Sequence, residues 1–160
     1  MPDFGPFIHQ LSIYSLIFVL VWAAVADVRT FRIANSLPLA LMALYPTYVM
    51  TASISVDWRF SLLIGAALLF ATGLLFAFEL MGGGDVKLLS ATAVWAGPEH
   101  IALFIVTTAI IGGMVSVARM VWVVLARAGM EISAVPLARI PYGLAIAGGG
   151  MFVAAQLLMG

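Results

Sequence analysis

Long apolar stretches, separated by short polar turns, are the feature that most limits how this chain can fold. Of its 160 residues, 64% are hydrophobic and only 9% are charged, and the mean hydropathy is +1.18. A soluble domain carries about 25% charged residues. Because so few charged side chains cannot cover a surface that faces water, the sequence predicts an all-α integral membrane protein whose solvent is the lipid bilayer.

These stretches predict about six transmembrane helices, since each spanning helix needs ~20 mostly apolar residues. We expect one membrane-embedded domain covering residues 1–160, with helices at 8–26, 36–54, 60–79, 86–96, 101–125 and 142–159. Gly97-Pro98 and Ile140-Pro141 are predicted helix breaks. The fourth stretch is short for a full span, so the glycines before it are expected to lie at membrane depth.

The first apolar stretch is interpreted as a retained helix rather than a cleaved secretory signal. Ala24-Val25-Ala26 has the small-x-small form of a cleavage site, but a signal begins with positive residues. The first 28 residues contain neither Lys nor Arg.

Composition also excludes several kinds of chemistry. The chain has no cysteine, which removes disulfides, thiolate catalysis and cysteine zinc sites. His9 and His100 cannot form a metal site alone, so no metal and no cofactor are expected. The formal net charge is zero, which gives no reason to expect a nucleic-acid partner.

The basic residues predict an orientation in the membrane. Six helices place both termini on one side, and the first, third and fifth loops on the other. Those three loops carry six basic residues, Arg29, Arg32, Lys87, Arg119, Arg127 and Arg139, whereas the other side carries only Arg59. Because positive residues favour the cytoplasm, we expect these loops to face the cytoplasm and both termini to lie on the outer side of the inner membrane.

Two aspartates follow odd-numbered predicted helices, Asp27 after the first and Asp85 after the third. Helix counting therefore places both at the cytoplasmic face. Each has an ordinary structural interpretation: Asp85 would be the N-cap of the fourth helix, and Asp27 a loop charge beside Arg29. The functional interpretation is a carboxylate pair. Two carboxyl groups close together cannot both ionise easily, so the charged one takes a proton from water while the neutral one hydrogen-bonds a carbonyl.

Three glycines precede Asp85, more than a helix cap needs. Glycine lets another backbone approach closely and adopts backbone angles that other residues avoid. Gly82 and Gly84 are therefore predicted to leave room for a substrate beside the carboxyl pair.

The segment GGGDVKLLSATAVWAGP, residues 82–98, resembles the GxGD segment of type IV prepilin peptidases. Residues 27–35, DVRTFRIAN, are similar to that family's other motif, an aspartate with basic residues and Ile-x-Asn. Pro141-Tyr142-Gly143-Leu144-Ala145 resembles its C-terminal Pro-Tyr-Gly-x-Ala element. The order and spacing of the three motifs agree over nearly the whole chain.

The resemblance implies an aspartic endopeptidase that removes the basic leader from type IV pilin-like precursors at the cytoplasmic face. It implies that Asp27 and Asp85 are the catalytic pair and that Gly82 and Gly84 are the fixed glycines. The partners are then prepilin or pseudopilin leader peptides within the lipid bilayer, with no oligomeric state indicated. Without cysteines or room for the CxxC-bearing insert of long members, the chain most resembles the short peptidases of tight-adherence (Flp) systems, for which N-methylation is doubtful.

Other classes stay open. A presenilin-like protease pairs GxGD with a Tyr-Asp motif on the preceding helix, whereas here Asp27 follows Ala26 on the first helix. An archaeal preflagellin peptidase has compatible chemistry. A transporter would use the segment around 80–90 as a broken-helix site, and an assembly subunit would need neither aspartate.

Three further residues are candidates for supporting roles. Lys87 stands two positions after Asp85, so on a helix their side chains diverge, and it is expected to snorkel to the interface or to tune the pair. Arg29 is a topology signal or a substrate contact, and Asn35 a cap or loop residue. Glu79 is a helix-end charge or a contact for the basic leader.

Overall fold

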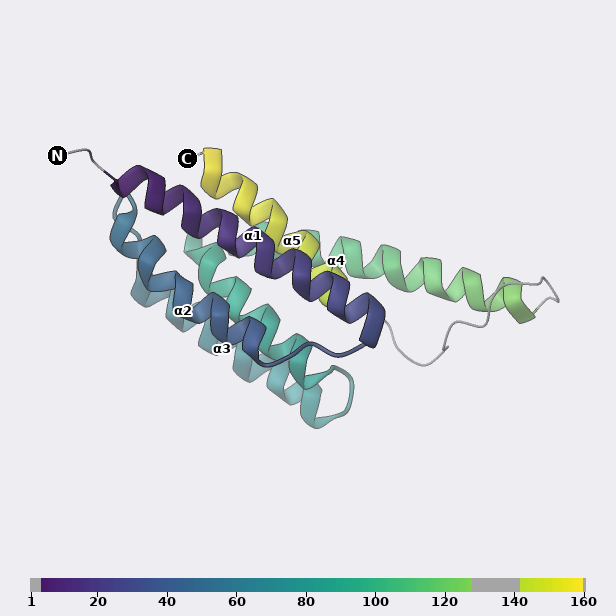
Figure 1. Cartoon of the computed structure of the whole chain (residues 1–160). Coiled ribbons are helices and arrows are strands. Elements are labelled where there is room, and N and C mark those ends of the chain that lie inside the picture. The colour runs from purple at the N-terminus through teal and green to yellow at the C-terminus, as the bar shows by residue number, and fades with distance from the viewer. Residues whose placement is uncertain (1–3, 128–141, 160) are drawn as a thin grey trace.

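The computed structural model describes residues 4–127 and 142–159, and these residues form helices without any strand. The helices are α1 (Gly5–Thr30), α2 (Ser36–Thr51), α3 (Trp58–Ala77), α4 (Gly83–Arg127) and α5 (Tyr142–Met159). They lie side by side as a bundle (Figure 1). The all-α prediction is therefore confirmed for the described part of the chain.

The predicted count of six helices is not confirmed. Four of the described helices, α1, α3, α4 and α5, are long and apolar enough to cross a membrane. The second predicted helix is shorter than expected, because α2 ends at Thr51. The predicted break at Ile140-Pro141, like Arg139, lies outside the described residues.

The predicted break at Gly97-Pro98 is confirmed, although it lies inside α4. Gly97 has φ 58° and ψ −173°, which no helix contains, and glycine reaches a positive φ without strain. Pro98 follows, and proline is well suited to the first turn of a new helical segment. The fourth and fifth predicted helices are therefore the two parts of α4, before and after this kink.

The first part of α4 occupies the centre of the bundle. It packs against α2, α3 and α5, and Trp95 near its end is only 2% exposed. The Trp95 indole N–H donates to the Leu41 carbonyl of α2 at 3.0 Å, which satisfies a buried donor. The second part packs beside α5 and projects past the ends of the other helices (Figure 1).

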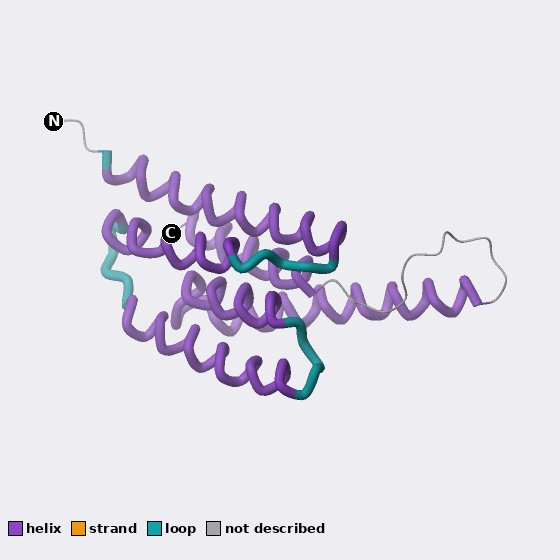
Figure 2. Tube along the Cα trace, turned by 60° about the horizontal axis from the view of Figure 1, so that its bottom comes forward, coloured by secondary structure: helices purple, strands orange, loops and turns teal. Residues whose placement is uncertain are grey.

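Turns gather at the two ends of the bundle. The turns that join α1 to α2 and α3 to α4 lie at one end, and the turn that joins α2 to α3 lies at the other (Figure 2). At that other end, the Asp57 carboxylate caps α3 by accepting the Phe60 N–H at 3.2 Å. The outer faces carry large exposed apolar side chains such as Phe18, Phe70 and Met114. Such an apolar surface is suited to contact with lipid. Together with the four long apolar helices, it shows that the chain is a multi-pass membrane protein.

Small residues let α5 approach its neighbours closely. A Cβ at Gly150 would stand 2.7 Å from Leu20 of α1 and 2.8 Å from Thr92 of α4, both fully buried. Gly149 faces Thr108 and the Phe104 carbonyl in the same way. Residues 148–150 therefore form a close contact between helices.

The substitution Gly150→Ala should destabilise the bundle by about 1–3 kcal/mol, because buried neighbours must shift to admit the methyl group. The measurement is thermal unfolding of the detergent-solubilised protein. Gly113→Ala is the matched control, since a Cβ there meets no described atom within 4 Å. Equal melting temperatures for the two variants would contradict this packing.

Candidate active site

Asp27 and Asp85 lie at the same end of the bundle and line one cavity. Asp27 is in the last turn of α1 and Asp85 in the first turn of α4. The cavity has a volume of about 930 Å³ and is bounded by both turns at this end and by Tyr142 at the start of α5. Both carboxyl groups therefore contribute to one cavity.

The Asp27 carboxylate is held by the start of α5. Asp27 is only 4% exposed, and its Oδ2 accepts the Gly143 N–H at 2.7 Å. The first N–H groups of a helix have no partner within the helix, and the helix dipole favours negative charge there. The hydrogen bond therefore gives a partner both to the buried Asp27 oxygen and to a free N–H at the start of α5.

Gly143 is a site residue that the sequence analysis did not assign. A Cβ at this position would stand 2.8 Å from Asp27 Oδ2 and 2.8 Å from Ile33 Cδ1. Only glycine lets the α5 backbone come near enough to donate its N–H to the carboxylate. The signal was present in the Pro-Tyr-Gly-x-Ala element, but nothing local connects Gly143 with an aspartate 116 positions away.

Asp85 faces the cavity from a glycine-lined turn. Helix α4 begins at Gly83, and the Gly82 carbonyl accepts the Val86 N–H at 3.1 Å. Asp85 therefore lies within the first turn of α4, and its interpretation as the N-cap is wrong. Its Oδ1 is shielded from solvent and has no hydrogen-bond partner among the described residues. Such an oxygen is suited to hold a water molecule or a substrate group.

Two of the predicted glycines allow close approach, Gly82 to the Asp85 carboxylate and Gly84 to Ile33. A Cβ at Gly82 would stand 2.6 Å from Asp85 Oδ2, so any side chain there would displace the carboxylate. A Cβ at Gly84 would stand 3.0 Å from both the Cβ and the carbonyl oxygen of Ile33. Gly84 therefore lets α4 pack closely against the segment that follows Asp27.

Backbone strain is concentrated at the same cavity. Phe31 (φ 51°) and Glu79 (φ 59°) are the non-glycine residues with positive φ in the described part of the chain, and both line the cavity. Strained residues of this kind cluster at functional sites, where surrounding contacts hold them in place. The Phe31 ring lies 5.9 Å from the Arg119 guanidinium of α4, a distance suited to a cation–π contact.

The residues predicted to have supporting roles lie partly on the cavity side of α4 and partly on the side that faces α2. Glu79 and Arg32 line the cavity. Lys87 does not, and its ammonium donates to the Asn35 Oδ1 at 3.0 Å beside α2. The expected divergence of Lys87 from Asp85 is confirmed. Arg29 is exposed and does not line the cavity.

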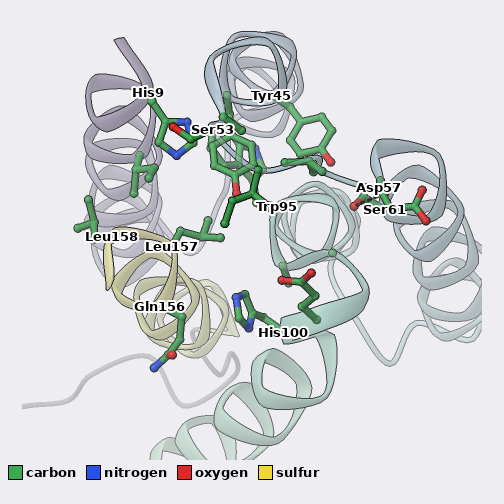
Figure 3. Close-up of a pocket in the computed structure, with 18 of the residues that line it drawn as sticks. His9, Tyr45, Ser53, Asp57, Ser61, Trp95, His100, Gln156, Leu157 and Leu158 are labelled. Carbon is green, nitrogen blue, oxygen red and sulfur yellow. Dashed lines mark hydrogen bonds between the residues drawn. The ribbon is translucent and has the colours of Figure 1, made fainter. Parts of the chain in front are cut away.

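A smaller cavity of about 300 Å³ lies at the opposite end of the bundle (Figure 3). His9 stacks on Tyr48 there with ring centroids 4.9 Å apart. Asp57, Glu99 and His100 also line this cavity. In neither cavity do the described residues form a group of three or more His, Cys, Asp or Glu side chains that could hold a metal ion.

Fold and site together define a multi-pass membrane protein that gathers two carboxyl groups in a cavity at one end of its helices. The chain belongs to the type IV leader peptidase family, whose family model matches residues 14–117. No curated protein and no solved structure matches the chain. The matched range includes Asp27 and Asp85 and ends before α5, which supplies Gly143.

The substitution Gly143→Ala should lower leader cleavage by about tenfold or more, because a methyl group would push the Asp27 carboxylate away from the α5 N–H and misplace it. Cleavage by the purified protein in detergent is the measurement, with helix content followed by circular dichroism. Gly73→Ala is the control, since a Cβ there meets no described atom within 4 Å. Wild-type cleavage by Gly143→Ala would exclude a positioning role for this contact.

Proposed function

We propose that the chain is an aspartic endopeptidase that uses Asp27 and Asp85 to remove the basic leader from type IV pilin-like precursors, of the Flp type, at the cytoplasmic membrane face. The observation that carries this proposal is the shared cavity, to which both carboxyl groups contribute. Membership of a leader peptidase family supports the reaction class.

In the proposed mechanism the pair acts as a unit with one proton between two carboxyl groups. The ionised carboxyl takes a proton from a water molecule, whose oxygen bonds to the carbonyl carbon of the scissile peptide. The protonated carboxyl hydrogen-bonds the carbonyl oxygen, where negative charge develops. The tetrahedral intermediate then breaks at its C–N bond, and the leaving nitrogen takes a proton from the pair.

The surroundings of the pair fit an extended peptide. Gly82 and Gly84 line the cavity beside Asp85, so a substrate backbone would meet no side chain at these two positions. Glu79 lies on the cavity wall, where its carboxylate suits a basic leader by charge. Arg29, Arg32 and Lys87 lie at the same end of the bundle as the aspartates, and Arg59 lies at the other. This distribution of charge supports a cytoplasmic site.

The cysteine-free sequence supports an Flp-type peptidase rather than a form that carries paired CxxC motifs. Methyl transfer to the new pilin N-terminus is not part of the proposal. The precursor is expected to reach the site with its leader at the membrane surface and its apolar helix in the bilayer.

Replacing either aspartate, by Asp27→Asn or Asp85→Asn, should lower cleavage by a factor of about 10³ or more while the protein stays folded, because amides neither share the proton nor activate water. The measurement is co-expression with a candidate Flp-type precursor, followed by the size of the precursor on a gel.

Asp57→Asn is the matched control for both variants. It carries the same chemical change at the opposite end of the bundle, and asparagine still caps α3. Full cleavage with Asp27→Asn or Asp85→Asn would exclude the pair mechanism. Loss of cleavage with Asp57→Asn as well would point to a general loss of function.

Chelators and thiol reagents should leave cleavage within about twofold of the untreated protein, because the proposed pair activates water without a metal or a thiolate. The test compares purified protein before and after treatment with a strong chelator and with a maleimide. Strong inhibition by the chelator, restored by one added metal ion, would contradict the mechanism.

A further inference from the structure

An apolar groove runs between α2 and α3 on the side of α4 away from the aspartates. Both α2 and α3 pack against α4 but hardly touch each other, so the first part of α4 forms the floor of the groove. Its volume is about 600 Å³. Most of its lining is apolar and includes Leu39 and Met42 of α2 and Ala66 and Leu69 of α3, with Asn35 and Lys87 at one end. None of these residues lines the aspartate cavity.

One positively charged side chain lies where the groove meets the turns. The Lys87 ammonium lies at this end and donates to the Asn35 Oδ1 at 3.0 Å. That bond uses one of three lysine donors and leaves the Asn35 amide N–H groups for another acceptor. Asn35 also precedes the first residue of α2, and its side chain makes no cap hydrogen bond there. The positive end of the α2 dipole therefore adds to the lysine charge.

We propose that this groove binds one anionic phospholipid. The phosphate accepts hydrogen bonds from Lys87 and Asn35, and one acyl chain lies along the groove between Leu39 and Met42 of α2 and Ala66 and Leu69 of α3. The ends of α1 and α3 and the start of α4 lie at this level, where spanning helices meet the membrane surface. Basic groups between helices at such a surface are suited to anionic headgroups.

Charge favours a lipid over the apolar helix of a pilin-like precursor as the occupant. The precursor of the proposed function carries a basic leader just before its helix. A helix in the groove would bring that leader next to Lys87, where like charges repel. An anionic headgroup is instead attracted to the Lys87 ammonium, and the acyl chain of the lipid contacts the apolar side chains of the groove.

Native mass spectrometry of the detergent-solubilised protein tests the proposal, with an equimolar mixture of dioleoylphosphatidylglycerol and dioleoylphosphatidylcholine as the probe. Wild type should retain one phosphatidylglycerol, with a preference of about fivefold over phosphatidylcholine. Lys87→Met should lower that preference about fivefold, and Lys87→Arg should keep it, since one basic residue supplies the headgroup contact. Arg59→Met removes an exposed cation at the opposite end of the bundle and should change nothing.

A groove-filling variant tests the acyl-chain contact separately. Ala66→Phe places a ring in the groove without altering Lys87, and it should remove the retained phosphatidylglycerol. Glycerol 3-phosphate, which has the phosphate but no chain, should not displace the lipid. Circular dichroism confirms that each variant is folded.

Three results would overturn the proposal: equal retention of the two lipids by wild type, an unchanged preference in Lys87→Met, or full lipid retention in Ala66→Phe. Slower precursor cleavage by Ala66→Phe with its lipid binding intact would assign the groove to the precursor helix instead. The binding assay contains no precursor, so its outcome is independent of the role proposed for Asp27 and Asp85.

Discussion

The hydrogen bond from the Gly143 N–H to the Asp27 carboxylate is the interaction on which the arrangement of the site depends. It joins the end of α1 to the start of α5 across 116 positions of sequence. Further along α5, Gly150 packs against Leu20 of α1 and Thr92 of α4. These contacts fix α5 along both neighbours, so the position of Asp27 relative to α4 follows from the packing of the whole bundle. The site is therefore sensitive to substitutions at a distance from either carboxyl group.

Glycine performs the same physical task at each point of close approach. At Gly82 it leaves space for the Asp85 carboxylate, at Gly84 it admits the Ile33 backbone, and at Gly143 it exposes an N–H to Asp27. Any Cβ would stand at 3.0 Å or less from its neighbour at these positions. In a bilayer there is no hydrophobic drive between helices, so close packing and hydrogen bonds must hold them together. The glycines thus allow the close packing that holds the helices together around the two aspartates.

Much of this arrangement is predictable from the sequence because it follows from local pattern. Apolar length predicts the helices, Gly97-Pro98 predicts the kink in α4, and helix counting places Asp27 and Asp85 at one end. Helical geometry also predicts that Lys87 points away from Asp85. The role of Gly143 and the pairing of Lys87 with Asn35 are not predictable in this way, since both depend on tertiary contacts between distant segments. The second helix was predicted to end at residue 54, whereas α2 ends at Thr51, because the apolar residues after Thr51 belong to the turn before α3.

We expect Asp27 and Asp85 to face each other across one cavity without help from substrate. Because the chain has no cysteine, the double variant Asp27→Cys/Asp85→Cys can be treated with a short bismaleimide in the absence of precursor. A protease site placed in the turn between α2 and α3 then shows whether the two halves stay joined on a gel. We predict joined halves for this pair and separate halves for Asp27→Cys/Glu99→Cys, whose thiols lie at opposite ends of the bundle. Cross-linking of the first pair only after precursor is added, or not at all, would contradict a preformed pair.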